Sequence, residues 1–231
     1  MCNPARAAEP IDTDGPDFVE SSEVVGHGRL QFEAHLAREH AARDAGHQTT
    51  TSTPTLLRLG VAQALELRLE TDGRVEVALG VKWHSQDRDP TAGIPALSWI
   101  LHFDTPTGSG DLRGRGIRPS LRAVATWDLP DDFALGLMPG IKLGTAPNGE
   151  RFVSGIFGAA LNRRWTERFR TFVEVAAPQI ATHRYGGTSL SWSLGAAYLI
   201  NNDWQLGVRA AAAATRAAPS GQLLFELAGR Y

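Results

Sequence analysis

The seven histidines are the residues of this sequence that first suggest chemistry, because imidazole serves as a metal ligand and as a general acid or base. Three of them, His35, His40 and His47, lie close together. Their spacing matches no metal-site motif, and the single cysteine, Cys2, has no second thiol for a disulfide or a metal site. We therefore expect no metal ion and no other cofactor, and we place these histidines around a solvated loop.

Two further motifs could indicate catalysis. Ser85 follows His84, but adjacent residues of a strand point to opposite faces and cannot form a catalytic Ser/His pair. The glycine-rich runs at 108–110 and 113–116 resemble a phosphate cradle, yet no helix pattern follows to supply a dipole. The sequence therefore predicts no catalytic residue and no enzyme, and it favours a flexible basic loop at 104–116.

Charged residues recur at every second position of several segments, where they alternate with apolar residues. In a strand, this spacing places the charged set on one face and the apolar set on the other. Both signs of charge are present. The charged set consists of Glu33, His35, Arg58, Glu66, Arg68, Glu76, Lys82, His102, Arg122, Lys142, Arg170, Glu174, Arg209 and Glu226.

The elements that position this set are strands. Apolar residues occupy every second position across 65–69 and 75–83, and the turn residues Asp72-Gly73 separate the two runs, as in a β-hairpin. The same alternation marks 97–103, 121–127, 133–143, 169–175, 190–198 and 204–210. Such segments are long enough for tilted strands to cross a bilayer.

With the runs at 28–38 and 221–231, we count about twelve strands, an even number as in bacterial single-chain barrels. Segments 50–59 and 151–162 alternate poorly and are assigned by spacing. Short turns are expected at 128–132, 162–167 and 201–203, and mostly longer loops at 39–49, 104–116, 144–150, 177–187 and 216–220. This asymmetry is typical of outer-membrane barrels, whose short turns face the periplasm. The links at 86–94 and 71–74 do not follow it.

Composition agrees with a barrel and excludes other classes of protein. A mean hydropathy of -0.19 is what alternating lipid-facing and lumen-facing residues average to. A net charge of -2, from 23 basic and 25 acidic residues, argues against nucleic acid as a partner. Serines and a threonine interrupt the longest uncharged stretch, 185–202, so no spanning helix is expected.

The ends of the strands and of the chain favour a membrane barrel. The six tryptophans lie near strand ends, as in an interfacial girdle. The last strand ends on Tyr231 after apolar residues at alternate positions, which resembles the assembly signal that the barrel assembly machinery reads. Periodicity alone does not distinguish this barrel from a soluble one with its faces inverted.

The N-terminal segment, residues 1–25, is too polar to be a strand of the barrel. It either enters the lumen as a plug or lies in the periplasm as a tail, and we favour the tail. Its first residues lack the basic region and apolar core of a secretory signal. Because residues 4–9 resemble the small-residue end of a cleavage site, we expect that a signal was truncated upstream or replaced.

Several short blocks occur in an order that is specific when they are found together. They read DGPDFVES at 14–21, GHGRLQFE at 26–33, TPTLLRLG at 53–60, ELRL at 66–69, and PAL with TPTGS at 95–97 and 105–109. Over residues 12–231 the chain resembles the outer-membrane family described as the putative MetA pathway of phenol degradation. The resemblance implies an outer-membrane β-barrel, and the family's name implies passage of small, often aromatic, molecules.

We therefore predict an all-β fold, a closed antiparallel transmembrane β-barrel of about 12 strands in an up-and-down meander, over residues 26–231. We expect a channel or transporter of the cell outer membrane that passes small organic molecules passively. The alternative is a closed structural or adhesion barrel with binding outer loops, because the charged set can either line a conduit or pair across the lumen and close it. Expected partners are outer-membrane lipid, lipopolysaccharide and small organic solutes.

Overall fold

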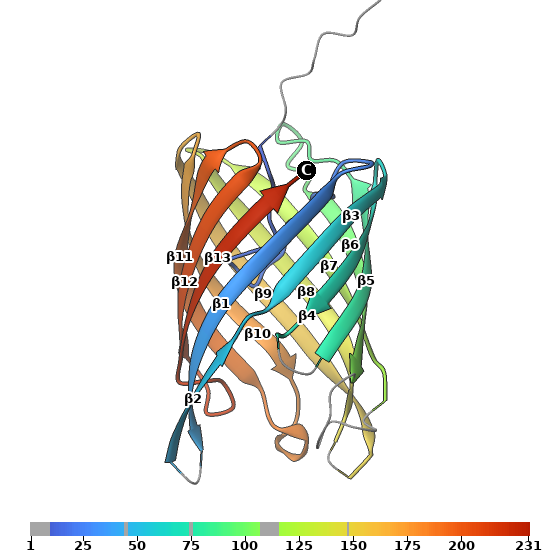
Figure 1. Cartoon of the computed structure of the whole chain (residues 1–231), viewed down its shortest axis with the longest axis vertical. Coiled ribbons are helices and arrows are strands. Elements are labelled where there is room, and N and C mark those ends of the chain that lie inside the picture. Colours follow the sequence, from blue (N-terminus) through green and yellow to red (C-terminus); the bar gives the residue numbers. More distant parts are fainter. Residues whose placement is uncertain (1–9, 44–45, 74–75, 107–115, 147) are drawn as a thin grey trace, which may run out of the picture.

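The computed structural model describes residues 10–43, 46–73, 76–106, 116–146 and 148–231, and its strands form a barrel (Figure 1). The strands are β1 Leu30–Arg43, β2 Gly46–Ser52, β3 Thr55–Ala62, β4 Leu65–Thr71, β5 Glu76–Gln86, β6 Ala96–Pro106, β7 Arg118–Leu129, β8 Phe133–Thr145, β9 Arg151–Thr166, β10 Phe169–Ile180, β11 Ser189–Asn201, β12 Trp204–Ala213 and β13 Gly221–Arg230. A short 3-10 turn, η1 His183–Tyr185, lies between β10 and β11.

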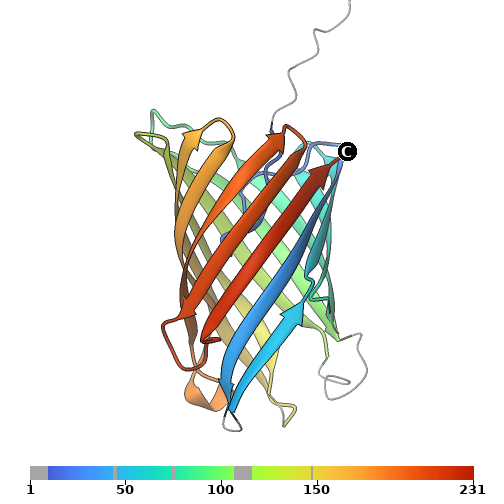
Figure 2. The ribbon, with the colours of Figure 1, turned by 60° about the vertical axis from the view of Figure 1, so that its left-hand side comes forward.

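The barrel has twelve strands around its wall and is closed. β2 and β3 are consecutive pieces of one wall strand, since both pair with β1, and Thr53 and Pro54 interrupt it. β13 pairs antiparallel with β1 from Gln31↔Arg230 to His40↔Gly221, which removes both sheet edges (Figure 2). The predicted closed meander of about 12 strands is confirmed.

The two ends of the barrel differ in the length of their links. The start of β1 and the C-terminus lie at one end, where the Leu30 and Tyr231 backbones bond to each other, and we call this end the terminal mouth. It is the upper end in Figure 1. Its turns at 130–132, 167–168 and 202–203 are short, whereas the opposite mouth has links at 146–150, 181–188 and 214–220. The long link at 87–95 is an exception at the terminal mouth.

One predicted segment differs from the observed structure, a second is explained by it, and a third lies largely outside the described residues. The loop expected at 39–49 is wrong, because β1 continues to Arg43 and β2 begins at Gly46, forming a hairpin that projects from the wall (Figure 1). Segment 151–162 alternates poorly because its inward positions, Ile156, Gly158 and Ala160, are apolar as well. Most of the basic loop expected at 104–116, residues 107–115, lies outside the described residues.

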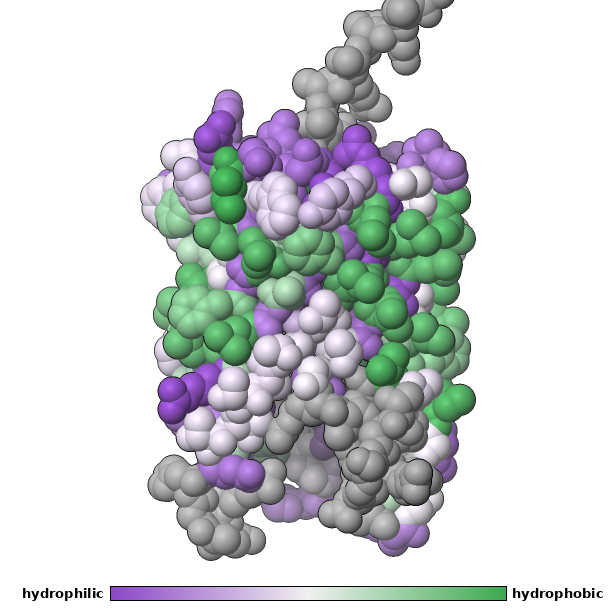
Figure 3. Space-filling model, in the orientation of Figure 1, coloured by the Kyte–Doolittle hydropathy of each residue, from purple (hydrophilic) through white to green (hydrophobic). Residues whose placement is uncertain are grey.

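The wall is apolar outside and charged inside. On β4, Glu66 and Arg68 are 0% and 3% exposed, whereas Leu67 and Leu69 are 46% and 41% exposed. A soluble barrel would show the reverse pattern. Figure 3 shows the result on one face of the barrel, where hydrophobic side chains cover the wall below the polar terminal mouth. No helix in the described part of the chain is long and apolar enough to span a membrane.

Candidate functional site: the barrel lumen and its inner segment

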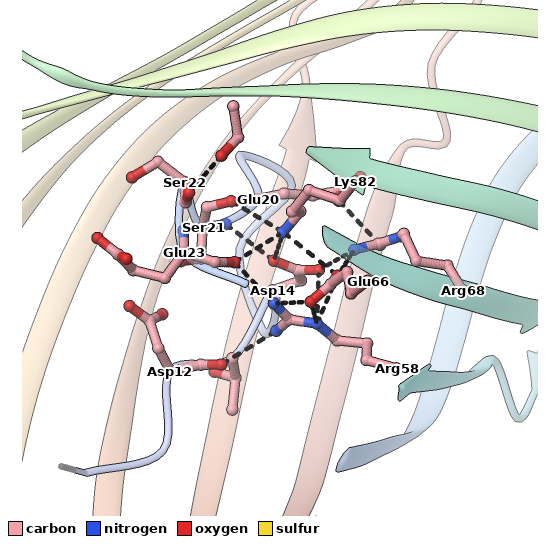
Figure 4. Close-up of polar contacts among 12 residues, drawn as sticks. Asp12, Asp14, Glu20, Ser21, Ser22, Glu23, Arg58, Glu66, Arg68 and Lys82 are labelled. Carbon is pink, nitrogen blue, oxygen red and sulfur yellow. Dashed lines mark hydrogen bonds and ion pairs between the residues drawn. The ribbon is translucent and has the colours of Figure 1, made fainter. Parts of the chain in front are cut away.

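Residues 10–29, here called the inner segment, enter the lumen from the terminal mouth and return to it. The Ile11 amide donates to the Asn202 carbonyl at 2.7 Å, where β11 ends, and the Gly28 amide donates to the Gly60 carbonyl at 2.8 Å on β3. Between these points the segment lies among inward-facing side chains of the wall (Figure 4). The free tail that we favoured for residues 1–25 is therefore wrong for the described part, residues 10–25.

Three wall carboxylates hold the backbone of the inner segment. Glu33 on β1 accepts the Asp14 and Gly15 amides at 3.0 and 3.1 Å. Glu174 on β10 accepts the Phe18 and Val19 amides at 2.6 and 3.1 Å. Glu66 on β4 accepts the Val25 amide at 2.8 Å. Hydrogen bonds to ionised acceptors are stronger than neutral ones, so these contacts fix the path of the segment.

Asp14 is the centre of an ion-pair cluster in Figure 4. Its carboxylate pairs with Lys82 at 2.7 Å and with Arg68, and it lies 3.6 Å from Arg58. Arg58 also binds Glu66 at 2.9 Å. Burial would raise the pKa of Asp14, but Arg58, Lys82 and Arg68 together hold it well below its usual range. Asp14 therefore stays ionised inside the barrel.

Further contacts hold the deeper part of the segment. Glu20 pairs with Arg122 and, at 2.9 Å, with Arg68, while Asp17 lies 3.3 Å from Arg170. Backbone carbonyls accept from the wall as well: Lys82 donates to Ser21 at 2.9 Å and Arg58 donates to Glu23 at 2.8 Å. The inner segment thus contacts β1, β3, β4, β5, β7 and β10.

An apolar patch of the wall receives Phe18 and Val19. Val19 packs with the fully buried Ile100, Val124, Met138 and Ala160, and Phe18 packs against this cluster. Two glycines leave room for it: a Cβ at Gly158 would lie 2.7 Å from Val19 Cγ2, and one at Gly136 would lie 3.0 Å from Val19 Cγ1. The absence of side chains at these two positions therefore lets the wall accommodate Val19 of the inner segment.

A cavity of about 540 Å³ opens between the inner segment and the wall at the terminal mouth. Its lining combines apolar groups, among them Val19 and Phe133, with polar ones such as Thr126, Asn162 and Arg170. Its volume and mixed lining are those of a site for a small organic molecule.

The predicted charged set divides into two groups by location. Eight members contact the inner segment: Glu33, Arg58, Glu66, Arg68, Lys82, Arg122, Arg170 and Glu174. Three others pair within the wall: His102 lies 3.2 Å from Glu70, Lys142 lies 2.6 Å from Asp104, and Arg209 lies 3.8 Å from Glu174. The side chain of Glu76 lies outside the described residues.

His35 and Glu226 complete the set, and with Glu33 they form a compact group. One ligand atom from each of the three lies within 4.8 Å of the others. The Glu33 oxygens, however, already accept hydrogen bonds from the Asp14 and Gly15 amides, Gln31 and Arg58. This group does not fit a metal ion, because one of its carboxylates is fully engaged.

Sequence reasoning missed the partners of this set. Asp14 and Glu20 were assigned only to a polar segment, and Glu70 and Asp104 were left out of the inward-facing set. Ile100 and Val124 carried a readable signal, since they are apolar residues at positions that are polar in neighbouring repeats. They mark where the wall contacts an apolar part of the inner segment.

Solved structures with a similar fold are outer-membrane barrels. An outer membrane channel from Pseudomonas putida F1 superimposes with a TM-score of 0.69 at 11% identity, covering 94% of this chain and 99% of that one. The translocator domain of the autotransporter NalP from Neisseria meningitidis gives 0.57 at 14% identity, covering 90% and 89%. The KdgM porin, solved with disordered oligogalacturonate, gives 0.56 at 9% identity, covering 88% and 98%.

No curated protein matches this sequence. A family model does match, and it spans residues 13–231, nearly the whole chain. The blocks at 14–21 and 26–33 that carry the resemblance supply the ion-pairing residues Asp14, Glu20 and Glu33. The chain therefore belongs to the outer-membrane barrel family described as Putative MetA-pathway of phenol degradation.

Proposed function

We propose that this chain is a passive channel of the cell outer membrane for small organic molecules, with the inner segment as its gate. The observation that carries the proposal is the inner segment itself, which occupies the half of the lumen next to the terminal mouth through charge-assisted contacts. Each such contact replaces one made to water and contributes only about 1.5–3 kcal/mol net, so the segment can exchange one set of partners for the other. Passage then requires the segment to move.

The membrane location is supported by the outward apolar belt and by the barrel neighbours. The terminal mouth would face the periplasm, as short turns and chain termini do in bacterial outer-membrane barrels. Lipopolysaccharide would then contact the loops of the opposite mouth.

The substrate class is inferred from the surfaces that a molecule would contact inside the barrel. The cavity at the terminal mouth combines apolar side chains such as Phe133 and Phe169 with charged ones such as Arg170, and the Phe18 and Val19 patch is apolar. This combination suits small aromatic molecules that carry a polar group. The family's description, which names phenol degradation, agrees with this class. The structural neighbours include channels and porins, and we propose transport without catalysis.

The first prediction concerns conductance in planar bilayers. The wild-type chain should give rare or small current steps, and a chain lacking residues 10–25 should give frequent steps several-fold larger, because the lumen beside β4, β5 and β10 is then empty. SDS resistance before heating checks that both chains are folded. Flux of benzoate into liposomes, compared with glucose, then tests the substrate class.

The alternative function is a closed structural barrel. It is favoured by the complete burial of Glu33, Arg58, Glu66 and Lys82, which shows how tightly charges fill this part of the lumen. Silence of both the wild-type and the deleted chain in bilayers would support this alternative and overturn the channel.

A further inference from the structure

An apolar groove of about 540 Å³ lies on the outer wall, over the ends of β9 to β12 near the terminal mouth. Register explains its shape. One outward row runs across the strands as Arg163, Thr171, Ala196 and Val208. The small side chains of Thr171 and Ala196 leave a depression between the larger residues at the ends of this row.

The next outward row deepens the groove. It contains Leu161, Val173, Leu194 and Ala210, which follow one another by the same strand pairing. Trp165 also lines the groove, and its indole Nε1 donates to the Thr171 hydroxyl at 2.8 Å. The groove is therefore bounded by fixed apolar side chains.

Arg163 is unusual because it is a cation on the lipid-facing side of the wall. Its guanidinium lies 4.0 Å from the centre of the Trp165 ring and 4.9 Å from that of Phe133. Within the described residues it forms no ion pair, and the carboxylate of Asp132, the residue before Phe133, pairs with Arg164 instead. A charge on the lipid face is tolerated near the interface, where an anionic group can meet it.

We infer that this groove binds an anionic glycerophospholipid of the inner leaflet. One acyl chain would lie along Val173, Leu194 and Ala196, and the phosphate would accept hydrogen bonds from Arg163. Guanidinium groups suit phosphate oxygens because several N–H donors lie in one plane, and the aromatic rings hold this one in place. The groove's volume of about 540 Å³ lies within the range of small-molecule sites, which is room for part of one acyl chain. The inference rests on the proposed membrane location.

Native mass spectrometry of the detergent-purified barrel tests it, with phosphatidylglycerol and phosphatidylethanolamine offered at equal concentration. The wild-type chain should retain phosphatidylglycerol preferentially. Arg163→Gln should weaken that retention about tenfold, the effect of losing one charge-assisted contact. Ala196→Phe, which fills the groove with an apolar ring, should weaken retention of both lipids.

Arg164→Gln is the matched control, because Arg164 is the next residue on β9 and pairs with Asp132 at 2.8 Å at the mouth. It should bind lipid like the wild type. Equal losses in Arg163→Gln and Arg164→Gln, or equal retention of the two lipids by the wild type, would overturn the inference. Insertion into vesicles is measured first. Insertion without lipid preference would overturn only the lipid site in the groove, whereas failure to insert would overturn both the membrane location and the lipid site.

Discussion

Asp14 is the residue on which the docking of the inner segment depends most. It brings one negative charge to Arg58, Arg68 and Lys82, which are all buried. Removing one partner of a buried ion pair costs about 3–5 kcal/mol, because the other charges are left uncompensated. The wall also holds Glu66 and Glu33 close to these cations, so loss of Asp14 should release the segment without unfolding the barrel.

Asp14→Ala should therefore expose the inner segment to protease added at the terminal mouth. Cleavage should be at least about a hundredfold faster than in the wild type, as expected from a loss of about 3 kcal/mol. Asp132→Ala is the control, since its pair with Arg164 is exposed and worth about 0–1 kcal/mol. Equal cleavage of Asp14→Ala and wild type would show that the other contacts suffice.

The lowered pKa of Asp14 fixes the sign of its pH dependence. An aspartate whose pKa is depressed by docking stabilises the docked state above its ordinary pKa of about 4 and loses that contribution only as pH falls through the lower value. The contribution of Asp14 to protection, measured as the difference in cleavage between wild type and Asp14→Ala, should thus be unchanged between about pH 7 and pH 5. A contribution that falls over this range would contradict the lowered pKa of Asp14.

A substitution at Gly158 tests the apolar contacts between the inner segment and the wall. A Cβ there would lie 2.7 Å from Val19, so Gly158→Val must displace the segment, at a cost of about 1–3 kcal/mol for overpacking. Hydrogen exchange of the Phe18 and Val19 amides should accelerate by about tenfold or more. Gly221→Ala, whose new Cβ has its nearest neighbour at 3.8 Å, should leave the exchange unchanged. Unchanged exchange in Gly158→Val would refute close packing of Val19.

At the residue scale, the sequence predicted which side chains face inward but not what they meet. Glu66, Arg68 and Lys82 follow from alternation, which is a local property of a strand. Their partner Asp14 lies in a segment without periodicity, far away in sequence. Polarity alone is consistent with both a solvated tail and a docked segment, so the sequence does not distinguish the two.

At the scale of elements, prediction succeeded where each strand has one lipid-facing side. β4, β5 and β13 carry outward apolar residues at every second position, and the sequence predicts their bounds to within about three residues. The alternation is a weak signal where both faces are alike. The β1–β2 hairpin carries polar residues such as Gln48 and Thr49 on both faces, whereas β9 carries apolar residues on both, since its inward side meets Phe18 and Val19.

At the scale of the whole molecule, the closure of the barrel and the placement of apolar residues outside and charged residues inside depend on each other. Closing β13 onto β1 leaves no open edge, so every wall strand is paired on both sides as a bilayer requires. The apolar belt can then face lipid only if the charges inside are neutralised, and the inner segment supplies part of that neutralisation through Asp14, Asp17 and Glu20. The inner segment, which we propose as the gate, thus also contributes to the electrostatics of the fold.

Migration on SDS gels tests this whole-molecule arrangement. A closed membrane barrel refolded in detergent should stay compact in SDS until boiled, so unheated and boiled samples should run as two different bands. A chain that ends at residue 220 lacks β13 and leaves β12 and β1 with open edges, and it should run as one band regardless of heating. A wild-type chain that is soluble without detergent and shows no heat-dependent shift would instead require the apolar side chains to face inward, contrary to their exposure on β4 and β5.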